Sequence, residues 1–245
     1  MAKESEGTKG QVVVVDIASG PGEPAATIAN AMPHTTVFST DFSPDMHKVA
    51  AAKAINIPNL KAMVADAQDL SAFASNSVDC VTCCYGYMFP EDPVKCLSEA
   101  YRILKPGGSL INTHWQTLVM MDINKGIMKA IYEAQPTPVV TPPLGINPLA
   151  HSEEGLFISI AVKGGFRKEN VETVASTYPF NLGKNKDWQF KLSTIPIRSK
   201  IDEFNGHDIA HRVYNELIGK YTQIDKKTGD MLAIDNTFIM TTIKK

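Results

Sequence analysis

Apolar runs alternate with helical patterns along the first half of the chain. Runs rich in β-branched and apolar residues predict strands at 11–16, 37–41, 60–65, 78–85 and 109–115. Helices are predicted at 24–32, 45–55 and 93–104, with Pro24, Pro44 and Pro93 at or just before their starts. This order predicts right-handed βαβ units and a parallel sheet that helices cover on both faces.

The second half has a less regular pattern. Helices are expected at 119–134, from Ser152 to the stop at Gly164-Gly165, and around 198–220, with strands at 171–178 and 236–243. Between the first two of these helices, prolines crowd residues 136–148, a stretch that fits neither a regular helix nor a central strand.

Composition narrows the class of protein. The chain has 245 residues, of which 44% are hydrophobic and 20% charged, as expected of a globular protein. Its net charge of -2 provides no general attraction for nucleic acid, and no apolar run approaches the ~18 residues that span a bilayer. The polar N-terminus resembles neither a secretory signal nor a transit peptide. Four cysteines, three of them in 80–84, predict a reducing, cytoplasmic location.

Chemistry first appears where the first two predicted strands end. Asp16-Ile-Ala-Ser-Gly20-Pro-Gly22 is a glycine-containing turn between a strand and a helix, which lets the backbone approach a ligand. Asp41 ends the next strand about 20 residues further on, where a carboxylate commonly binds a ribose diol. Together these features indicate a nucleoside-containing cofactor without choosing among the possible ones.

Further segments carry a resemblance to a known family. In order along residues 11–115, these are 14–22, 40–46, 64–70, 78–81 with 89–93, and 102–108. In these motifs the chain resembles the class I S-adenosylmethionine-dependent methyltransferases, especially the ubiquinone/menaquinone C-methyltransferase-like and small-molecule subgroup. The resemblance implies an α/β fold: a Rossmann-like, doubly wound, mostly parallel seven-stranded sheet with an antiparallel last strand. We expect a single domain, 1–245, with a cofactor-binding half at 11–115 and a substrate-side half at 116–245 whose segment 136–148 forms a lid.

The resemblance also implies roles for individual residues toward S-adenosylmethionine and its product S-adenosylhomocysteine. Gly20 and Gly22 would leave room for the methionine part, and Asp16 would orient its ammonium directly or through water. Asp41 would accept hydrogen bonds from both ribose hydroxyls, and Asp66 would accept one from the adenine amino group. Phe42 and Met46 would contact the two faces of the adenine, and Ala67 would donate its backbone N–H to the ring. Cys84 or Tyr85 would lie near the sulfonium. Ala18 and Gln68 are further expected contacts of the cofactor. The family usually has a lid helix before the first strand, whereas only ten residues precede it here.

The expected reaction is in-line methyl transfer to a small-molecule acceptor through O, N or thioether S. Candidate bases are Tyr85, His114 and His151, and a thioether acceptor would need none. The alternatives are a quinone-type C-methyltransferase and a non-catalytic S-adenosylmethionine-binding regulator. An NAD-dependent oxidoreductase would share the glycine turn and Asp41, but not the 64–70 and 102–108 segments.

No metal site is expected. His207 and His211 have the i, i+4 spacing of a metal pair, but the sequence suggests no third ligand, and a solvated helix face is favoured. Cys80, Cys83 and Cys84 are interpreted as small buried side chains, because alternation sends Cys83 to the face opposite Cys84. The expected partner is a small molecule, without nucleic acid or a membrane span, and the expected state is a monomer or homodimer.

Overall fold

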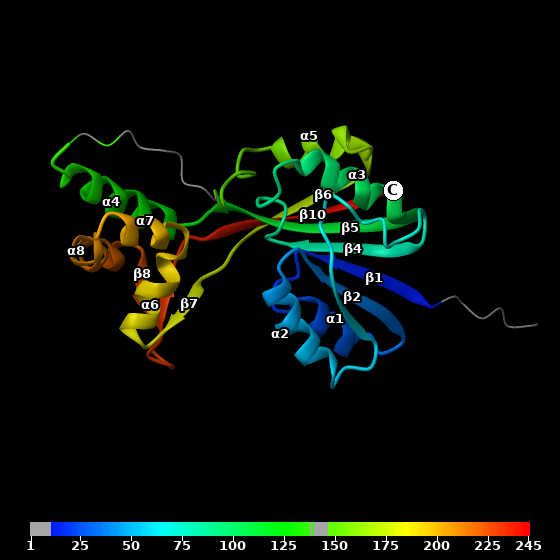
Figure 1. Ribbon diagram of the computed structural model, residues 1–245, viewed down its shortest axis with the longest axis horizontal. Helices are drawn as coiled ribbons and strands as arrows, with labels where there is room; N and C mark the ends of the chain where they lie inside the picture. Colours follow the sequence, from blue (N-terminus) through cyan, green and yellow to red (C-terminus); the bar gives the residue numbers. More distant parts are fainter. Residues whose placement is uncertain (1–10, 138, 140–146) are drawn as a thin grey trace, which may run out of the picture. The chain divides into compact units, whose positions relative to one another are not determined.

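The computed structural model describes residues 11–137, 139 and 147–245, and these residues divide into two compact units. The first unit comprises Met1–Thr113, Gly155–Thr173 and Met240–Lys245; the second comprises His114–Glu154 and Val174–Ile239. The chain therefore leaves the first unit and returns to it twice, and the boundary is not a single point near residue 115. Whether the two units act as one domain stays a prediction. Figure 1 labels most of their helices and strands.

Within the described residues a seven-stranded sheet has the order β3-β2-β1-β4-β5-β10-β6. Its strands are β1 (Val12–Ile17), β2 (Thr35–Asp41), β3 (Leu60–Val64), β4 (Val78–Cys84), β5 (Leu104–Thr117), β6 (Val171–Thr177) and β10 (Thr237–Lys244). β1 to β5 pair in parallel, and β10 runs antiparallel to β5. The predicted fold class is confirmed, including the antiparallel last strand.

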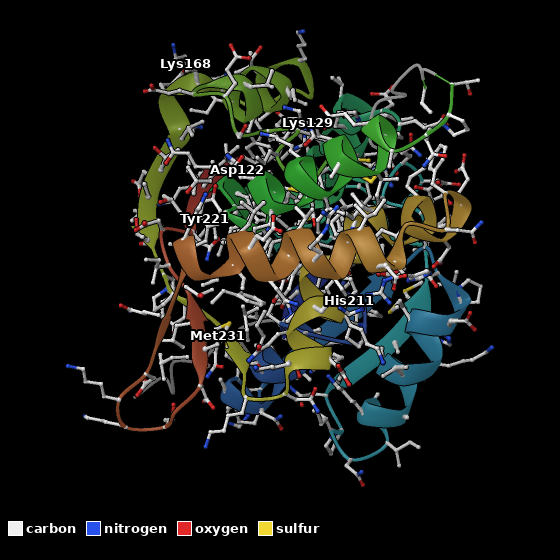
Figure 2. All side chains as sticks on the ribbon, turned by 90° about the vertical axis from the view of Figure 1, so that its left-hand side faces the viewer. Asp122, Lys129, Lys168, His211, Tyr221 and Met231 are labelled. Atoms are coloured by element: carbon white, nitrogen blue, oxygen red, sulfur yellow. The ribbon has the colours of Figure 1, made fainter. Side chains whose placement is uncertain are left out.

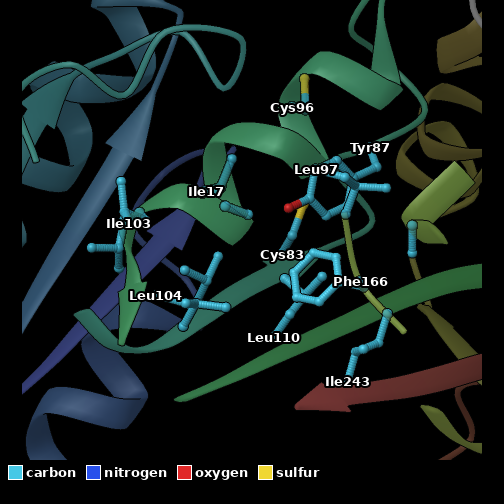
Figure 3. Packing of buried hydrophobic residues seen from close by; sticks show 14 of the residues in the cluster. Ile17, Cys83, Tyr87, Cys96, Leu97, Ile103, Leu104, Leu110, Phe166 and Ile243 are labelled. Atoms are coloured by element: carbon cyan, nitrogen blue, oxygen red, sulfur yellow. The ribbon is translucent and has the colours of Figure 1, made fainter. Parts of the chain in front are cut away.

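Helices cover both faces of this sheet in the first unit (Figure 1). α1 (Ala25–Ala31) and α2 (Pro44–Ala54) cover one face, where buried alanines of α1 pack on β1 and β2. α3 (Pro93–Ile103) and α5 (Leu156–Lys163) cover the other face, over the larger core that Figure 3 shows. Cys83 lies in this larger core and Cys80 packs against the opposite one, as strand alternation predicts.

The second unit is a helical cluster with a small sheet. Its helices are α4 (Met120–Glu133), α6 (Lys186–Ser193), α7 (Arg198–Glu203) and α8 (His207–Leu217), and its antiparallel sheet has the order β7 (Phe180–Gly183), β9 (Met231–Ala233), β8 (Thr222–Ile224). Short 3₁₀ turns lie at Lys168–Asn170 in the first unit and at Ile195–Ile197 and Ile218–Lys220 in the second. α4 and α8 pack against each other through a separate apolar core (Figure 2).

The second half differs from the sequence predictions in three places. The helix expected from Ser152 begins at Leu156, after Gly155 in a left-handed conformation with φ 75°. The helix expected around 198–220 is broken into α7 and α8, because the chain turns at Gly206, where a Cβ would lie 2.6 Å from Ile131 Cδ1. α6 and the three-stranded sheet were not predicted, since strands of three or four residues have too short a pattern to recognise.

Most of the expected lid, 136–148, lies outside the described residues, because 138 and 140–146 are not among them. The lid stays a prediction. No helix in the described parts of the chain is both long and apolar enough to cross a membrane.

Candidate cofactor and acceptor site

Two loops with unusual backbone geometry follow the carboxyl ends of β1 and β4, which are neighbours in the sheet. After β1, Ala18, Gly20 and Gly22 have φ angles of 52°, 55° and 93°. A Cβ on Gly20 would meet nothing within 4 Å, whereas one on Gly22 would lie 3.2 Å from Ala50 Cβ of α2. Gly20 thus borders open space that suits a ligand, and Gly22 lets the loop pack on α2.

Asp16 is fully buried beneath this turn. Its carboxylate accepts hydrogen bonds from Thr82 Oγ1 at 2.6 Å and from the backbone N–H of Ala25 at 3.2 Å. Burial raises the pKa of Asp16 to about 6, because desolvation disfavours the charged form more than the hydrogen bonds favour it. Asp16 therefore joins β1 to β4 and to the start of α1. Its expected contact with a ligand ammonium stays a prediction.

Asp41 connects the glycine turn to the end of β2. Its carboxylate accepts from the backbone N–H of Gly20 and of Ser43, each at 2.8 Å. Ser19 N–H also donates to Thr40 O at 2.9 Å, and Ser39 Oγ donates to Ser19 Oγ at 2.8 Å. A carboxylate has about four acceptor positions, so two remain for a ligand's hydroxyl groups.

The loop after β3 is connected to the same carboxyl edge. Ala65 N–H donates to Asp41 O at 3.0 Å. Asp66 accepts from the backbone N–H of Gln68 at 2.8 Å, and Gln68 Oε1 accepts from the N–H of Asp92 at 3.2 Å. The predicted residues Asp66, Ala67 and Gln68 are all half-buried, so they stand at the surface of the first unit rather than in its core.

Two apolar side chains stand unusually exposed beside these carboxylates. Phe42 directly follows Asp41 and is 74% exposed, and Met46 in the first turn of α2 is 42% exposed. Ser43 caps this helix, since its side chain accepts from Met46 N–H at 3.4 Å. A phenylalanine and a methionine left in water next to hydrogen-bonding groups suit the faces of a planar base.

The end of β4 carries the second strained turn. Tyr85 has φ 55°, an unusual conformation for a bulky side chain, and its N–H donates to Thr113 O at 3.0 Å. Thr113 Oγ1 donates to Cys84 Sγ at 3.2 Å. Burial raises the pKa of Tyr85 to about 12, so its phenol is a hydrogen-bond donor rather than a base at neutral pH. Burial also raises the pKa of Cys84.

Two residues that sequence reasoning missed hold these turns together. Thr82 bonds Asp16, as described, and Gly86 lies where a Cβ would be 2.7 Å from Ala18 Cβ and 2.6 Å from Cys83 Sγ. A glycine directly after the strand was the available signal for Gly86. Thr82 had no such signal, because its partner is 66 residues away in sequence.

The structure brings the two predicted histidines together in the second unit. His114 and His151 are both buried, with ring centroids 6.3 Å apart and ring planes perpendicular. Desolvation, aided by the neighbouring His151, lowers the pKa of His114 to about 4, and desolvation also lowers the pKa of His151. Both rings are therefore neutral at pH 7 and retain a nitrogen that can take a proton. Tyr85, the third candidate base, belongs to the first unit.

The histidines considered as a metal pair are engaged separately. His207 Nε2 lies 2.9 Å from Asp202 Oδ1, and the ring of His211 stacks on Phe190 with centroids 3.7 Å apart. Figure 2 shows His211 on α8. Within the described ranges, no three His, Cys, Asp or Glu side chains are grouped so that they could hold a metal ion.

Residues 15–112 match the protein family described as "Methyltransferase domain". These residues are similar to a methyltransferase domain. The match confirms the resemblance to the class I S-adenosylmethionine-dependent methyltransferases inferred from the motifs, and the glycine turn, Asp41 and the 65–69 loop all fall within this domain.

Known proteins resemble the methyltransferase domain in sequence and fold. Ubiquinone/menaquinone biosynthesis C-methyltransferase UbiE from Rickettsia prowazekii is 32% identical over 127 residues, 49% of this chain and 49% of its own length. The chain thus spans about half the length of the curated relatives it matches. The YcgJ protein from Bacillus subtilis has a TM-score of 0.60 at 16% identity, covering 96% of this chain and 92% of its own.

A further solved structure is CrArsM, an arsenic (III) S-adenosylmethionine methyltransferase from Chlamydomonas reinhardtii. Its TM-score is 0.52 at 16% identity, over 96% of this chain and 64% of that protein. At such identities the two structures establish the fold and nothing about the acceptor.

Proposed function

We propose that this protein is an enzyme that transfers a methyl group from S-adenosylmethionine to a small-molecule acceptor. The observation that carries the proposal is the hydrogen-bonded edge centred on Asp41. It joins the glycine turn to the end of β2 and, through the carbonyl of Asp41, to the 65–69 loop. The match of residues 15–112 to the methyltransferase domain family supports it.

The residues present fit this cofactor. Asp41 retains acceptor positions for the ribose hydroxyls, and Gly20 borders open space that accommodates the methionine part. Phe42 and Met46 are exposed for contact with the adenine faces, and Asp66 is half-buried with a carboxylate to accept the adenine amino group. When bound, S-adenosylmethionine would supply a methyl group activated by its sulfonium: the acceptor atom would bond to the methyl carbon in line with the breaking carbon–sulfur bond, and S-adenosylhomocysteine would be the leaving group.

The chain's own residues would then position the acceptor and manage its proton. Methylation at a ring carbon, a hydroxyl oxygen or a nitrogen that carries hydrogen releases one proton from the acceptor, and methylation at a thioether releases none. His114 and His151 are neutral at pH 7, so either can accept that proton. The name of the Rickettsia relative favours a quinone-type ring carbon as the acceptor atom, and this finer assignment belongs to the proposal.

The proposal is tested first through cofactor binding. Asp41→Ala should weaken S-adenosylhomocysteine binding by about 1.5–3 kcal/mol, the range for hydrogen bonds to a charged group. Titration calorimetry measures this change. Asp45→Ala is the matched control: it removes a carboxylate four residues away that is exposed and paired with Lys48. Equal affinity of Asp41→Ala and the native protein would contradict the ribose role.

The reaction itself is tested with S-adenosylmethionine labelled at the methyl group. The protein is incubated with this cofactor and a panel of quinols, phenols, amines and thioethers, and labelled products are separated by chromatography. Label in one acceptor class, lost in Asp41→Ala and kept in Asp45→Ala, supports methyl transfer. Tight cofactor binding with no labelled product in any class or in cell extract would instead support the non-catalytic regulator.

A further inference from the structure

The second unit contains a cavity of about 170 Å³ of its own. Its walls are mostly apolar and include Trp115 of β5, Leu118 just after it, Met121 in the first turn of α4, and Leu182 of β7. Phe180 and Ile195 also line it and are partly exposed, at 38% and 64%, so they mark the side open to solvent. A cavity of this size accommodates a small ring system.

One polar side chain in this cavity stands out. Asn124 on α4 is fully buried, and neither its Oδ1 nor its Nδ2 has a hydrogen-bond partner among the described residues. Its neighbours on the same buried helix face, such as Ile123 and Ile127, are apolar. Burying an amide without partners costs free energy, so an unpaired amide that lines a cavity needs an explanation.

A second asparagine shows what a structural amide looks like in the same cavity. Asn236 is also fully buried, but its Oδ1 accepts from Val119 N–H at 3.1 Å and its Nδ2 donates to Ala233 O at 3.0 Å. Asn236 connects two segments of the unit, and both ends of its amide are hydrogen-bonded. Asn124 connects nothing in this way, and its amide lines the cavity.

The lining also defines the charge of an occupant. Among the described residues that form the cavity, none is Asp, Glu, Lys, Arg or His. A charged ligand would lose its hydration without gaining a partner, so the occupant is neutral. An amide donates and accepts, and it therefore suits a carbonyl or hydroxyl group on an otherwise apolar molecule.

We propose that this cavity, named here the Asn124 pocket, binds a neutral, mostly apolar ring compound whose carbonyl or hydroxyl group hydrogen-bonds to Asn124. We assign this compound as the methyl acceptor, an assignment that rests on the proposed function. Trp115 of the pocket stands two residues after Thr113, which pairs with Cys84 at the carboxyl edge of the sheet. Asn124 is then the residue that selects acceptors by their polar group.

The test uses two probes that share one skeleton. 1-Indanone and indane differ in a single carbonyl group, and calorimetry measures the binding of each to the full-length protein. Asn124→Leu should bind 1-indanone at least tenfold more weakly and bind indane as well as the native protein does. Asn215→Leu, the same change at an exposed position of α8, should alter neither affinity.

Two further variants keep the result interpretable. Trp188→Phe leaves Trp115 as the single tryptophan, so a change in emission when a probe binds places that probe in the pocket. Ile195→Glu adds a charge on the exposed side without disturbing the core and should weaken both probes. Asn124→Leu should melt no lower than the native protein, because it removes an unpaired amide.

Equal affinities of Asn124→Leu and the native protein for 1-indanone overturn the proposal and leave the amide as a water site. Absence of binding of both probes overturns it as well. Binding of S-adenosylhomocysteine, measured in parallel, separates the two proposals. If S-adenosylhomocysteine binds while the two probes do not, the pocket assignment alone fails. If the two probes bind while S-adenosylhomocysteine does not, the proposed function fails, and the assignment of the ring compound as the methyl acceptor fails too.

Discussion

At the residue scale, a buried carboxylate supports the loops of the candidate site. Asp16 is removed from water, yet it accepts hydrogen bonds from Thr82 and from the N–H of Ala25. These bonds do not compensate for desolvation, since the pKa of Asp16 rises from 3.8 to about 6. At neutral pH, keeping the charged carboxylate of Asp16 buried therefore lowers the free energy of unfolding.

This cost predicts how stability depends on pH. Between the unfolded pKa of 3.8 and the folded pKa of about 6, the folded state binds more protons than the unfolded state, so stability falls as pH rises. Asp16→Asn removes this titration, because its Oδ1 can accept from Ala25 and its Nδ2 can donate to Thr82. Urea unfolding from pH 4 to 7 should show the native protein losing about 1–3 kcal/mol relative to the variant. A difference that stays constant with pH would mean that Asp16 is charged and well solvated.

The histidine pair predicts a second titration at this scale. Desolvation and the neighbouring His151 lower the pKa of His114 to about 4, so its ring should stay neutral until the solution is distinctly acid. NMR of protein labelled at histidine should give a His114 midpoint near this value. In His151→Asn the midpoint should rise, because the charge of the second ring is removed. A midpoint near 6.5 in the native protein would show that the ring is hydrated.

At the scale of elements, the two strained turns after β1 and β4 pack against each other. They meet at Gly86, where the space between Ala18 and Cys83 is too small for a Cβ atom. The loop after β3 is held by α3, where Glu99 accepts from Leu70 N–H and Arg102 donates to the carbonyls of Leu70 and Phe73. Arg102, the first residue of the 102–108 motif, therefore holds this loop on α3.

Gly86 gives the prediction for this scale. Gly86→Ala must separate the two turns, which should lower the free energy of unfolding by about 1–3 kcal/mol and weaken S-adenosylhomocysteine binding. Chemical denaturation and calorimetry measure the two effects. Gly219→Ala is the control, since a Cβ there meets nothing within 4 Å and its φ is not positive. If Gly86→Ala keeps native stability and affinity, the close approach of the turns is not required.

At the scale of the whole molecule, three strands link the two units. β5, β6 and β10 each have residues in both, so neither unit is a continuous stretch of chain that ends at one boundary. Unfolding of one unit would remove part of the strands of the other. We therefore expect the two units to unfold together.

The two tryptophans make this expectation measurable. Trp115 and Trp188 both belong to the second unit, whereas far-ultraviolet circular dichroism reports helices and strands of both. Urea transitions by fluorescence and by circular dichroism should coincide. S-adenosylhomocysteine at 100 times its Kd should stabilise both by about 2.7 kcal/mol. A fluorescence transition at lower urea than the dichroism transition would show that the second unit unfolds by itself.

Local patterns along the sequence determined the sheet. All seven strands of the large sheet were predicted, because β-branched runs and the prolines at helix starts are signals that need no distant partner. The positions of Asp16, Asp41 and Asp66, each within two residues of a strand end, follow from the same patterns. Parallel strands then bring their carboxyl ends to one edge, so the edge itself could be predicted.

Only the tertiary structure decided which groups are satisfied and which are available. Asp16 is bonded to Thr82 across 66 residues, and Gly86 is a glycine because of Ala18, in a different loop. The small sheet of the second unit and the break at Gly206 depend on contacts between distant segments. Asn124 looks in the sequence like any polar residue of a helix. Its burial beside an apolar cavity without a partner among the described residues arises from how α4 packs, and no local pattern records that.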